Sequence, residues 1–135
     1  MKIAIGIDPD TIESGLAVYG NGKLELFTFP LFQLFMKLVE LKMENEITVY
    51  LESGHLVKGI WHKGGVGAAK RVGANHQIGK EIEKFLIYSN IKYHLVNPQG
   101  YSQYSHKSFC RITGWNEKVR TNSEKRVAGL LCFGK

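Results

Sequence analysis

The stretch Ile3-Ala4-Ile5-Gly6-Ile7-Asp8-Pro9-Asp10 decides the fold of this chain, and Thr11, Gly15 and a second apolar run, Leu16-Ala17-Val18-Tyr19, follow it. Apolar residues alternate up to Asp8, so residues 2–8 are predicted to form a strand that ends on a carboxylate. A carboxylate at the tip of a buried strand costs stability unless a cation or hydrogen bonds compensate its charge. Asp8 is therefore the first candidate functional residue, and its partners have to come from the rest of the chain.

Length and composition indicate one globular domain, residues 1–135. Hydrophobic residues make up 44% of the chain and charged residues 22%, an ordinary balance for a soluble domain. Cys110 and Cys132 are the only cysteines, so no disulfide framework is expected and a reducing, cytoplasmic compartment is the default. The apolar stretches are too short to cross a bilayer and the N-terminus reads directly as a strand, so we expect no membrane segment.

The charge is divided unevenly along the chain. Residues 1–52 carry four Lys against eight Asp and Glu, a net charge of −4, whereas residues 53–135 carry fourteen Lys and Arg against four Glu, a net charge of +10. Such a basic half suits a polyanion as partner, because neutralising phosphates drives most non-specific binding of nucleic acids. The alternative is a basic surface without a binding role.

The predicted order of elements is β-β-β-α-β-α-β-α, which indicates one compact α/β domain. Asn21-Gly22 is a hairpin turn, Pro30 opens a helix, and the last helix begins with a capping box formed by Thr121 or Asn122 with Glu124 in its first turn. By residue range, the elements after the first strand are strands at 15–20 and 23–29, a helix from 30, a strand at 46–52, a long helix at 66–88, a strand at 91–96, a short helix at 105–113 and a last helix at 121–133.

This order is that of the ribonuclease H-like fold, a mixed five-stranded sheet of three antiparallel and then parallel strands, flanked by helices. Gly6-Ile7-Asp8-Pro9, with Thr11 and Gly15-Leu16-Ala17, resembles the first motif of RuvC-type Holliday junction resolvases, and Tyr50-Leu51-Glu52 resembles the second. The resemblance covers nearly the whole chain, and the order and spacing of its motifs support it more than any single motif. Compact RuvC-like proteins of phages and prophages have stretches similar to Val72-Gly73-Ala74-Asn75, Ile112-Thr113-Gly114-Trp115 and Thr121-Asn122-Ser123-Glu124-Lys125-Arg126.

The resemblance implies a metal-dependent endonuclease that hydrolyses phosphodiester bonds in branched DNA, in recombination, repair or phage DNA processing. RuvC-like nucleases are taken to hold two divalent ions, one activating water and one stabilising the leaving oxygen, with carboxylates of the first strand, fourth strand and last helix. Here these residues are Asp8, Glu52 and Glu124, and the implied cofactor is Mg²⁺, for which Mn²⁺ can substitute. No organic cofactor is implied, and a homodimer on junction DNA is expected because two strands are nicked symmetrically.

Each of these carboxylates also has a purely structural interpretation. Asp8 before Pro9 is a common turn residue. Glu52 could be the solvated end of a strand, and Glu124 is favoured in a first helical turn by the helix dipole alone.

The chain departs from the RuvC pattern at Val127. Relatives usually carry another acidic residue, or sometimes histidine, one helical turn after the position of Glu124. Residues three apart share a helix face, so Val127 is expected to look toward the same site, where it cannot coordinate a metal. Asp10, which stands where the family more often has glycine, is the candidate replacement ligand. The alternative function is therefore a catalytically impaired nucleic-acid-binding protein of the same fold.

Basic and aromatic residues in two clusters are candidates for holding DNA. An aromatic side chain among cations suits stacking on exposed bases, although Trp61 could instead fill the core or a subunit contact. The resemblance assigns stabilisation of the transition state to a basic residue near the last helix, so Lys107 and Lys118 are both catalytic candidates. Arg126 faces either phosphate or solvent, and His76 is interpreted as a packing or surface histidine. The candidate nucleic-acid-binding residues are Lys58, Trp61, His62, Lys63, Lys70, Arg71, Arg111, Arg120 and Arg126.

Other site classes are excluded or rank lower. The two cysteines are too isolated for a zinc site, and no Gly-rich loop ends in Gly-Lys-Ser or Gly-Lys-Thr. A relationship to the actin and sugar-kinase ATPases, which have a similar first hairpin, would require a second lobe for which 135 residues leave no room.

Overall fold

The computed structural model describes residues 1–54 and 65–134, and the side chains of 65–72 lie outside the description. The elements predicted from the sequence are all present, with boundaries within two residues of those expected, and the 3-10 turn η2 is an addition. In chain order they are β1 (Lys2–Asp8), β2 (Ser14–Gly20), β3 (Lys23–Phe29), α1 (Leu31–Glu44), β4 (Glu46–Glu52), α2 (Gly65–Tyr88), β5 (Lys92–Val96), η2 (Tyr101–Gln103), α3 (His106–Thr113) and α4 (Ser123–Cys132).

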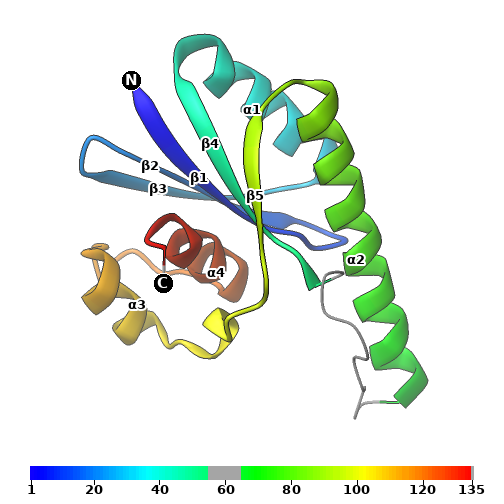
Figure 1. Ribbon diagram of the computed structural model, residues 1–135. Helices are drawn as coiled ribbons and strands as arrows, with labels where there is room; N and C mark the ends of the chain where they lie inside the picture. Colours follow the sequence, from blue (N-terminus) through cyan, green and yellow to red (C-terminus); the bar gives the residue numbers. More distant parts are fainter. Residues whose placement is uncertain (55–64, 135) are drawn as a thin grey trace.

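The five strands form one mixed sheet in the order β3-β2-β1-β4-β5. The first three strands pair antiparallel, whereas β4 runs parallel to β1 and β5 runs parallel to β4. Figure 1 shows α1 and α2 on one face of this sheet and α4, with α3 beyond it, on the other. The predicted fold class, a five-stranded mixed sheet flanked by helices, is therefore confirmed.

The alternation along β1 gives each face of the sheet a different role. Ile3, Ile5 and Ile7 are buried in the larger apolar cluster, which also contains buried leucines of α1 and α2. Because successive side chains of a strand point to opposite faces, Gly6 and Asp8 belong to the face that α4 covers. The carboxylate at the end of β1 therefore lies on the α4 side of the sheet.

Two glycines of the sheet let the backbone of α4 approach the strands directly. A Cβ atom on Gly6 would lie 2.0 Å from the carbonyl oxygen of Ala128, and one on Gly15 would lie 2.2 Å from the carbonyl oxygen of Glu124. Both distances are far below van der Waals contact, so only glycine fits at either position. The first turn of α4 is thereby fixed above Gly15, which pairs with Asp8 in the register of β1 and β2.

The start of α4 differs from the predicted capping box. Asn122 is the N-cap, and its side-chain oxygen accepts a 2.9 Å hydrogen bond from the backbone N–H of Lys125. Thr121 lies outside the cap, so its pairing with Glu124 as a capping box is wrong. Glu124 stands one position too early for the reciprocal bond that a capping box requires, and its carboxylate is not used to cap the helix.

None of the helices in the described part of the chain combines the length and the hydropathy that a membrane crossing needs.

The contact between α4 and the sheet gives a first testable prediction. Gly6→Ala is expected to lower the free energy of unfolding by roughly 1–3 kcal/mol or more, because the new methyl group forces the helix away from the strand. Urea denaturation followed by circular dichroism measures the loss. The matched control is Gly73→Ala, since Gly73 lies within α2 with no atom within 4 Å of its added Cβ. Equal stability of the two variants would contradict this account of α4 packing.

Candidate active site

Asp8 and Glu52 meet at one edge of the sheet. They end the neighbouring parallel strands β1 and β4, whose register pairs Ile7 with Leu51, the residues just before them. The carboxyl ends of parallel strands lie together, so the two side chains open into the same space. That space is a cavity of 170 Å³, which is also lined by Pro9, Ser53, Gly54, Asn75, His76, Gly79 and Pro98.

Glu124 reaches this edge of the sheet from α4. Its backbone lies on Gly15, the register partner of Asp8, and its charge acts on the Asp8 carboxyl. The three carboxylates predicted from the sequence therefore come from three separate elements to one end of the sheet. Asp8 and Glu52 line the cavity, while Glu124 approaches Asp8 from the α4 side.

Bringing these carboxylates together in a buried place disfavours their ionised forms. Burial, followed by the negative charges of Glu52, Glu124 and Asp10, raises the pKa of Asp8 from 3.8 to about 8. Burial also raises the pKa of Glu52. Every charge that shifts Asp8 is negative, so a cation in this region would relieve both the repulsion and the desolvation.

The donor set fits a hard divalent cation in its chemistry. Carboxylate oxygens are the ligands that Mg²⁺ takes from proteins, and substrate phosphate and water usually complete its shell. Within residues 1–54 and 65–134, however, no three His, Cys, Asp or Glu side chains already form a group that could hold a metal ion. This end of the sheet therefore carries side chains of the right chemical type, but they are not arranged as a complete coordination shell.

Asp10 is engaged in its own turn. Its side-chain oxygen accepts hydrogen bonds from the backbone N–H of Ile12, at 3.3 Å, and from the hydroxyl of Thr11, at 3.4 Å. Its backbone N–H donates to the hydroxyl of the buried Ser14 at 3.1 Å. Asp10 adds to the negative potential at Asp8, but it is not among the residues that line the cavity.

Val127 belongs to the apolar core beneath the sheet. Its side chain is 2% exposed and lies in a cluster with Tyr101, Phe109 and Leu130. Position 127 is thus enclosed by apolar side chains, although Val127 follows Glu124 by one helical turn. Val127 is therefore not among the residues that line the cavity with Asp8 and Glu52.

Two residues of α2 complete the cavity and were missed as functional candidates. His76, interpreted from the sequence as a packing or surface histidine, lines the cavity beside Asp8 and Glu52. Asn75 also lines it, and its side-chain oxygen accepts a 3.2 Å hydrogen bond from the backbone N–H of Thr11. The available signal was the resemblance of Val72-Gly73-Ala74-Asn75 to RuvC-like proteins, which ends immediately before His76.

The structure does not describe the side chains of the first predicted basic cluster. Lys58, Trp61, His62 and Lys63 lie outside the described residues, and Lys70 and Arg71 lie on α2 with side chains outside the description. Their predicted contacts with DNA remain predictions.

Basic residues at and before the last helix are partly used to hold the fold together. They are Arg126 and the second predicted basic cluster, which comprises His106, Lys107, Arg111, Lys118 and Arg120. The ring nitrogens of His106 contact the Thr121 hydroxyl and the Glu117 carbonyl, both at 2.8 Å. Arg126 donates to the carbonyl of Tyr104 at 3.0 Å and to that of Thr121 at 2.8 Å. Arg126 therefore anchors the loop before α4. The two alternatives predicted from the sequence, contact with phosphate or with solvent, did not include this role.

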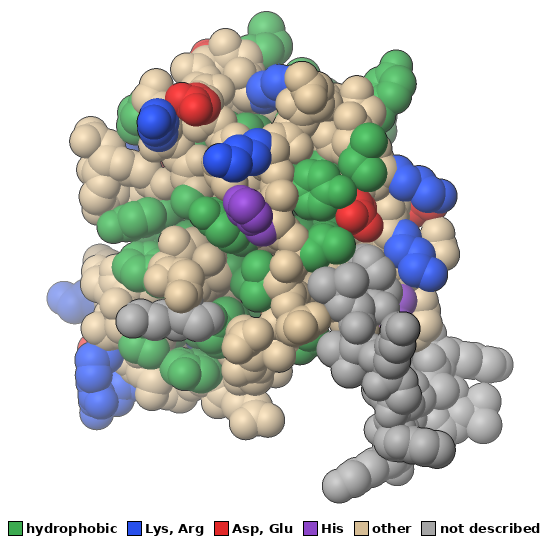
Figure 2. All heavy atoms as spheres, viewed as in Figure 1, with side chains coloured by type: hydrophobic (Ala, Val, Ile, Leu, Met, Phe, Trp, Pro, Cys, Tyr) green, Lys and Arg blue, Asp and Glu red, His purple; other side chains and the backbone are tan. Residues whose placement is uncertain are grey.

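The remaining members of that cluster are exposed, and none of them lines the cavity with Asp8. They are Lys107, Arg111, Lys118 and Arg120. On the face shown in Figure 2, Lys and Arg side chains stand in separate groups with hydrophobic side chains between them. The basic charge is thus spread over the surface of this face, without one continuous stripe.

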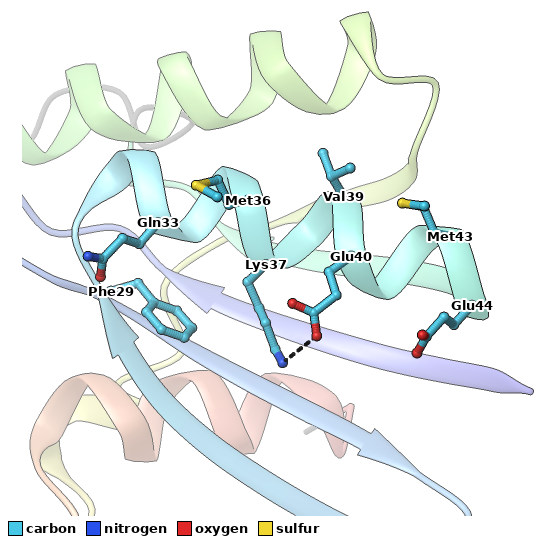
Figure 3. Close-up of a pocket in the computed structure, with 8 residues that line it drawn as sticks. All are labelled: Phe29, Gln33, Met36, Lys37, Val39, Glu40, Met43 and Glu44. Atoms are coloured by element: carbon cyan, nitrogen blue, oxygen red, sulfur yellow. Dashed lines mark hydrogen bonds and ion pairs between the residues drawn. The ribbon is translucent and has the colours of Figure 1, made fainter.

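A larger hollow of the described surface lies elsewhere. It has a volume of 700 Å³ and follows the outer side of α1 (Figure 3), where Met36, Val39 and Met43 leave much of their side chains exposed. Its charged lining includes the ion pair of Lys37 and Glu40, with 3.4 Å between nitrogen and oxygen. The two carboxylates of this hollow, Glu40 and Glu44, are exposed on one helix, and Glu40 is paired with Lys37. The smaller cavity instead brings together Asp8 and Glu52 from two strands, and burial raises the pKa of both, so it is the candidate active site.

Comparison with known proteins supports the fold. No model of a known protein family matches the chain, and no curated protein matches it in sequence. Among solved structures, the chain is similar to T. thermophilus RuvC in complex with a Holliday junction substrate, with a TM-score of 0.56 and 14% sequence identity. The match covers 97% of this chain and 92% of that one. The chain therefore has a RuvC-like fold over nearly its whole length.

The raised pKa of Asp8 predicts how stability depends on pH. The folded chain keeps the proton of this carboxyl up to about pH 8, whereas the unfolded chain releases it near 3.8. Without added metal, the stabilising contribution is complete below the lower value and is lost as the pH rises toward the upper one. Asp8→Asn should raise the free energy of unfolding at neutral pH by a few kcal/mol, since one pKa unit corresponds to about 1.4 kcal/mol.

Urea unfolding in chelator between about pH 5 and pH 8 measures this slope. The wild-type chain should lose stability across that range, and Asp8→Asn should flatten the loss. Glu25→Gln is the matched control, because Glu25 is an exposed carboxylate of β3. Parallel curves for the wild type and Asp8→Asn would mean that Asp8 is not the buried acid described above.

The burial of Val127 gives a further prediction. Val127→Asp should destabilise the chain by about 3 kcal/mol or more, because it places an unpaired charge among apolar side chains. Thermal denaturation measures the effect. Val119→Asp, at a position that is 48% exposed, is the control and should be nearly neutral. If Val127→Asp were as stable as Val119→Asp, position 127 would have access to solvent or to a cation.

Proposed function

We propose that this chain is a metal-dependent endonuclease that hydrolyses phosphodiester bonds in branched DNA such as a Holliday junction. The observation that carries the proposal is the convergence of Asp8 and Glu52 on one cavity, with Glu124 held beside Asp8 by the contact of α4 with Gly15. The fold similarity to T. thermophilus RuvC, whose structure contains a Holliday junction substrate, supports the choice of substrate.

Asp8, Glu52 and Glu124 are the residues proposed to hold divalent cations, with Mg²⁺ as the expected ion and Mn²⁺ as a substitute. Such ions, when bound, supply an activated water and stabilise the leaving oxygen of a phosphodiester. The three carboxylates come from β1, β4 and α4, so their spacing depends on the sheet and on the packing of α4. Asp10 is a weaker candidate ligand, because its side chain already accepts hydrogen bonds within its own turn.

DNA is proposed to reach this site through the basic second half of the chain. Lys107, Arg111, Lys118 and Arg120 are exposed and available for phosphate contacts. Lys107 and Lys118 remain the proposed catalytic cations, and approach to the scissile phosphate would have to accompany DNA binding, since neither lines the cavity. We also propose a homodimer, because symmetric nicking of two strands needs two sites, and a role in recombination, repair or phage DNA processing.

A second candidate function is a nucleic-acid-binding protein of the same fold with impaired catalysis. Val127 favours it, because α4 presents an apolar residue where relatives usually carry a fourth ligand, and its side chain is 2% exposed within an apolar cluster. The two functions share DNA binding and differ only in turnover.

Cleavage of a labelled four-way junction by the purified chain in Mg²⁺ or Mn²⁺ tests the proposal. Asp8→Asn should reduce cleavage by roughly 100-fold or more, as expected when a group that stabilises the transition state is removed, while junction binding persists. Glu25→Gln, an exposed carboxylate of β3, should cleave like the wild type. Binding without cleavage by the wild type would favour the impaired protein, and absence of both would exclude both functions.

A further inference from the structure

The middle of α2 forms one wall of the cavity that holds Asp8 and Glu52. Asn75, His76 and the buried Gly79 line it from this helix. The side-chain oxygen of Asn75 accepts a hydrogen bond from the backbone of Thr11, which ties α2 to the turn after β1. The position of α2 relative to Asp8 is therefore fixed by a specific contact.

The imidazole of His76 lies against the chain just beyond β4. A Cβ atom placed on Gly54 would be 2.7 Å from Nε2 of His76, so the tip of the ring occupies the space that a side chain at position 54 would need. Gly54 follows Glu52 by two residues, and both line the cavity with His76. The ring nitrogen is thus held at the same end of the sheet as the Glu52 carboxylate.

The cavity therefore combines two carboxylates with an imidazole, each from a different element. α4 contributes Glu124 near Asp8 but places Val127 in the apolar core, so His76 is the residue that adds a nitrogen donor to the lining of the cavity. Imidazole nitrogen binds borderline transition metals well, whereas Mg²⁺ prefers oxygen ligands. A site of this composition would rank cations differently from one built of carboxylates alone.

We propose that His76 supplies a nitrogen ligand to the divalent cation of this site, together with Asp8 and Glu52, and that the site consequently prefers Mn²⁺ to Mg²⁺. The inference rests on the proposed function, because it concerns the same cation site. The described side chains do not yet form a finished metal group, so the imidazole and the carboxylates have to close on the ion. The 170 Å³ of the cavity leaves space for that movement.

Binding of Mn²⁺ to the full chain without DNA tests the inference. Electron spin-echo spectroscopy of bound Mn²⁺ detects ¹⁴N coupling from a coordinated imidazole, and titration calorimetry gives the affinities for Mn²⁺ and Mg²⁺. The wild type should show the ¹⁴N coupling and bind Mn²⁺ more tightly than Mg²⁺. His76→Gln should lose the coupling and weaken Mn²⁺ binding by at least about 10-fold, the lower end of the loss seen even for outer partners of a metal ligand, with a smaller change for Mg²⁺.

His94→Gln is the matched control, because His94 is an exposed histidine of β5 whose ring stacks on Tyr50. It should keep both the coupling and the affinity. If His76→Gln fails to fold, as judged by circular dichroism, His76→Asn provides the second variant. The wild-type spectrum remains decisive in either case, since labelling histidine with ¹⁵N must change the coupling pattern if an imidazole is bound.

The outcomes separate this inference from the proposed function. Bound Mn²⁺ that is lost in Asp8→Asn but shows no ¹⁴N coupling in the wild type would overturn the role of His76 and leave the metal-dependent nuclease intact. Coupling that survives in His76→Gln would assign the nitrogen to another residue and also overturn the inference. Failure of the wild type to bind either cation, together with failure to cleave junctions, would overturn both.

Discussion

The backbone of α4 lies on the backbones of β1 and β2, and the candidate site depends on this contact. Gly6 and Gly15 leave no side chain between helix and sheet, and the carbonyl oxygens of Ala128 and Glu124 occupy the space where Cβ atoms would stand. The approach sets the height of the helix above the sheet and the position of its first turn. A larger residue at either glycine would move Glu124 away from the end of β1.

The same closeness explains the electrostatic character of the site. Bringing α4 onto the sheet places the charge of Glu124 near Asp8, while the parallel pairing of β1 and β4 brings Glu52 beside it. Burial and like charges together disfavour the ionised form of Asp8. An extensive apolar cluster on the opposite face of the sheet offsets this local destabilisation. It contains alternate residues of β1 and β4 together with the inner sides of α1 and α2. The larger apolar cluster thus lies on the face of the sheet opposite to the one from which α4 approaches Asp8.

The burial of Val127 also follows from packing. The turn of α4 after Glu124 enters the second apolar cluster, where Tyr101 and Phe109 surround Val127. A helix residue can face a polar cavity or an apolar core, and here position 127 belongs to the core. One wall of the cavity is formed by α2, through Asn75 and His76.

The sequence by itself determined the order of elements and placed two carboxylates at strand ends, because alternation and helical spacing are local patterns that a single chain displays. The mixed sheet was predicted from the resemblance of this order to the ribonuclease H-like fold. Asp8 and Glu52 could be predicted to meet, since the ends of adjacent parallel strands share one edge. The resemblance also predicted that Glu124 joins them, but its contact with Gly15, the burial of Val127 and the place of His76 in the cavity were decided only by tertiary structure. Each depends on the distance and rotation of a helix relative to the sheet, which are set by contacts between residues far apart in sequence, such as Gly15 with Glu124 and Gly54 with His76.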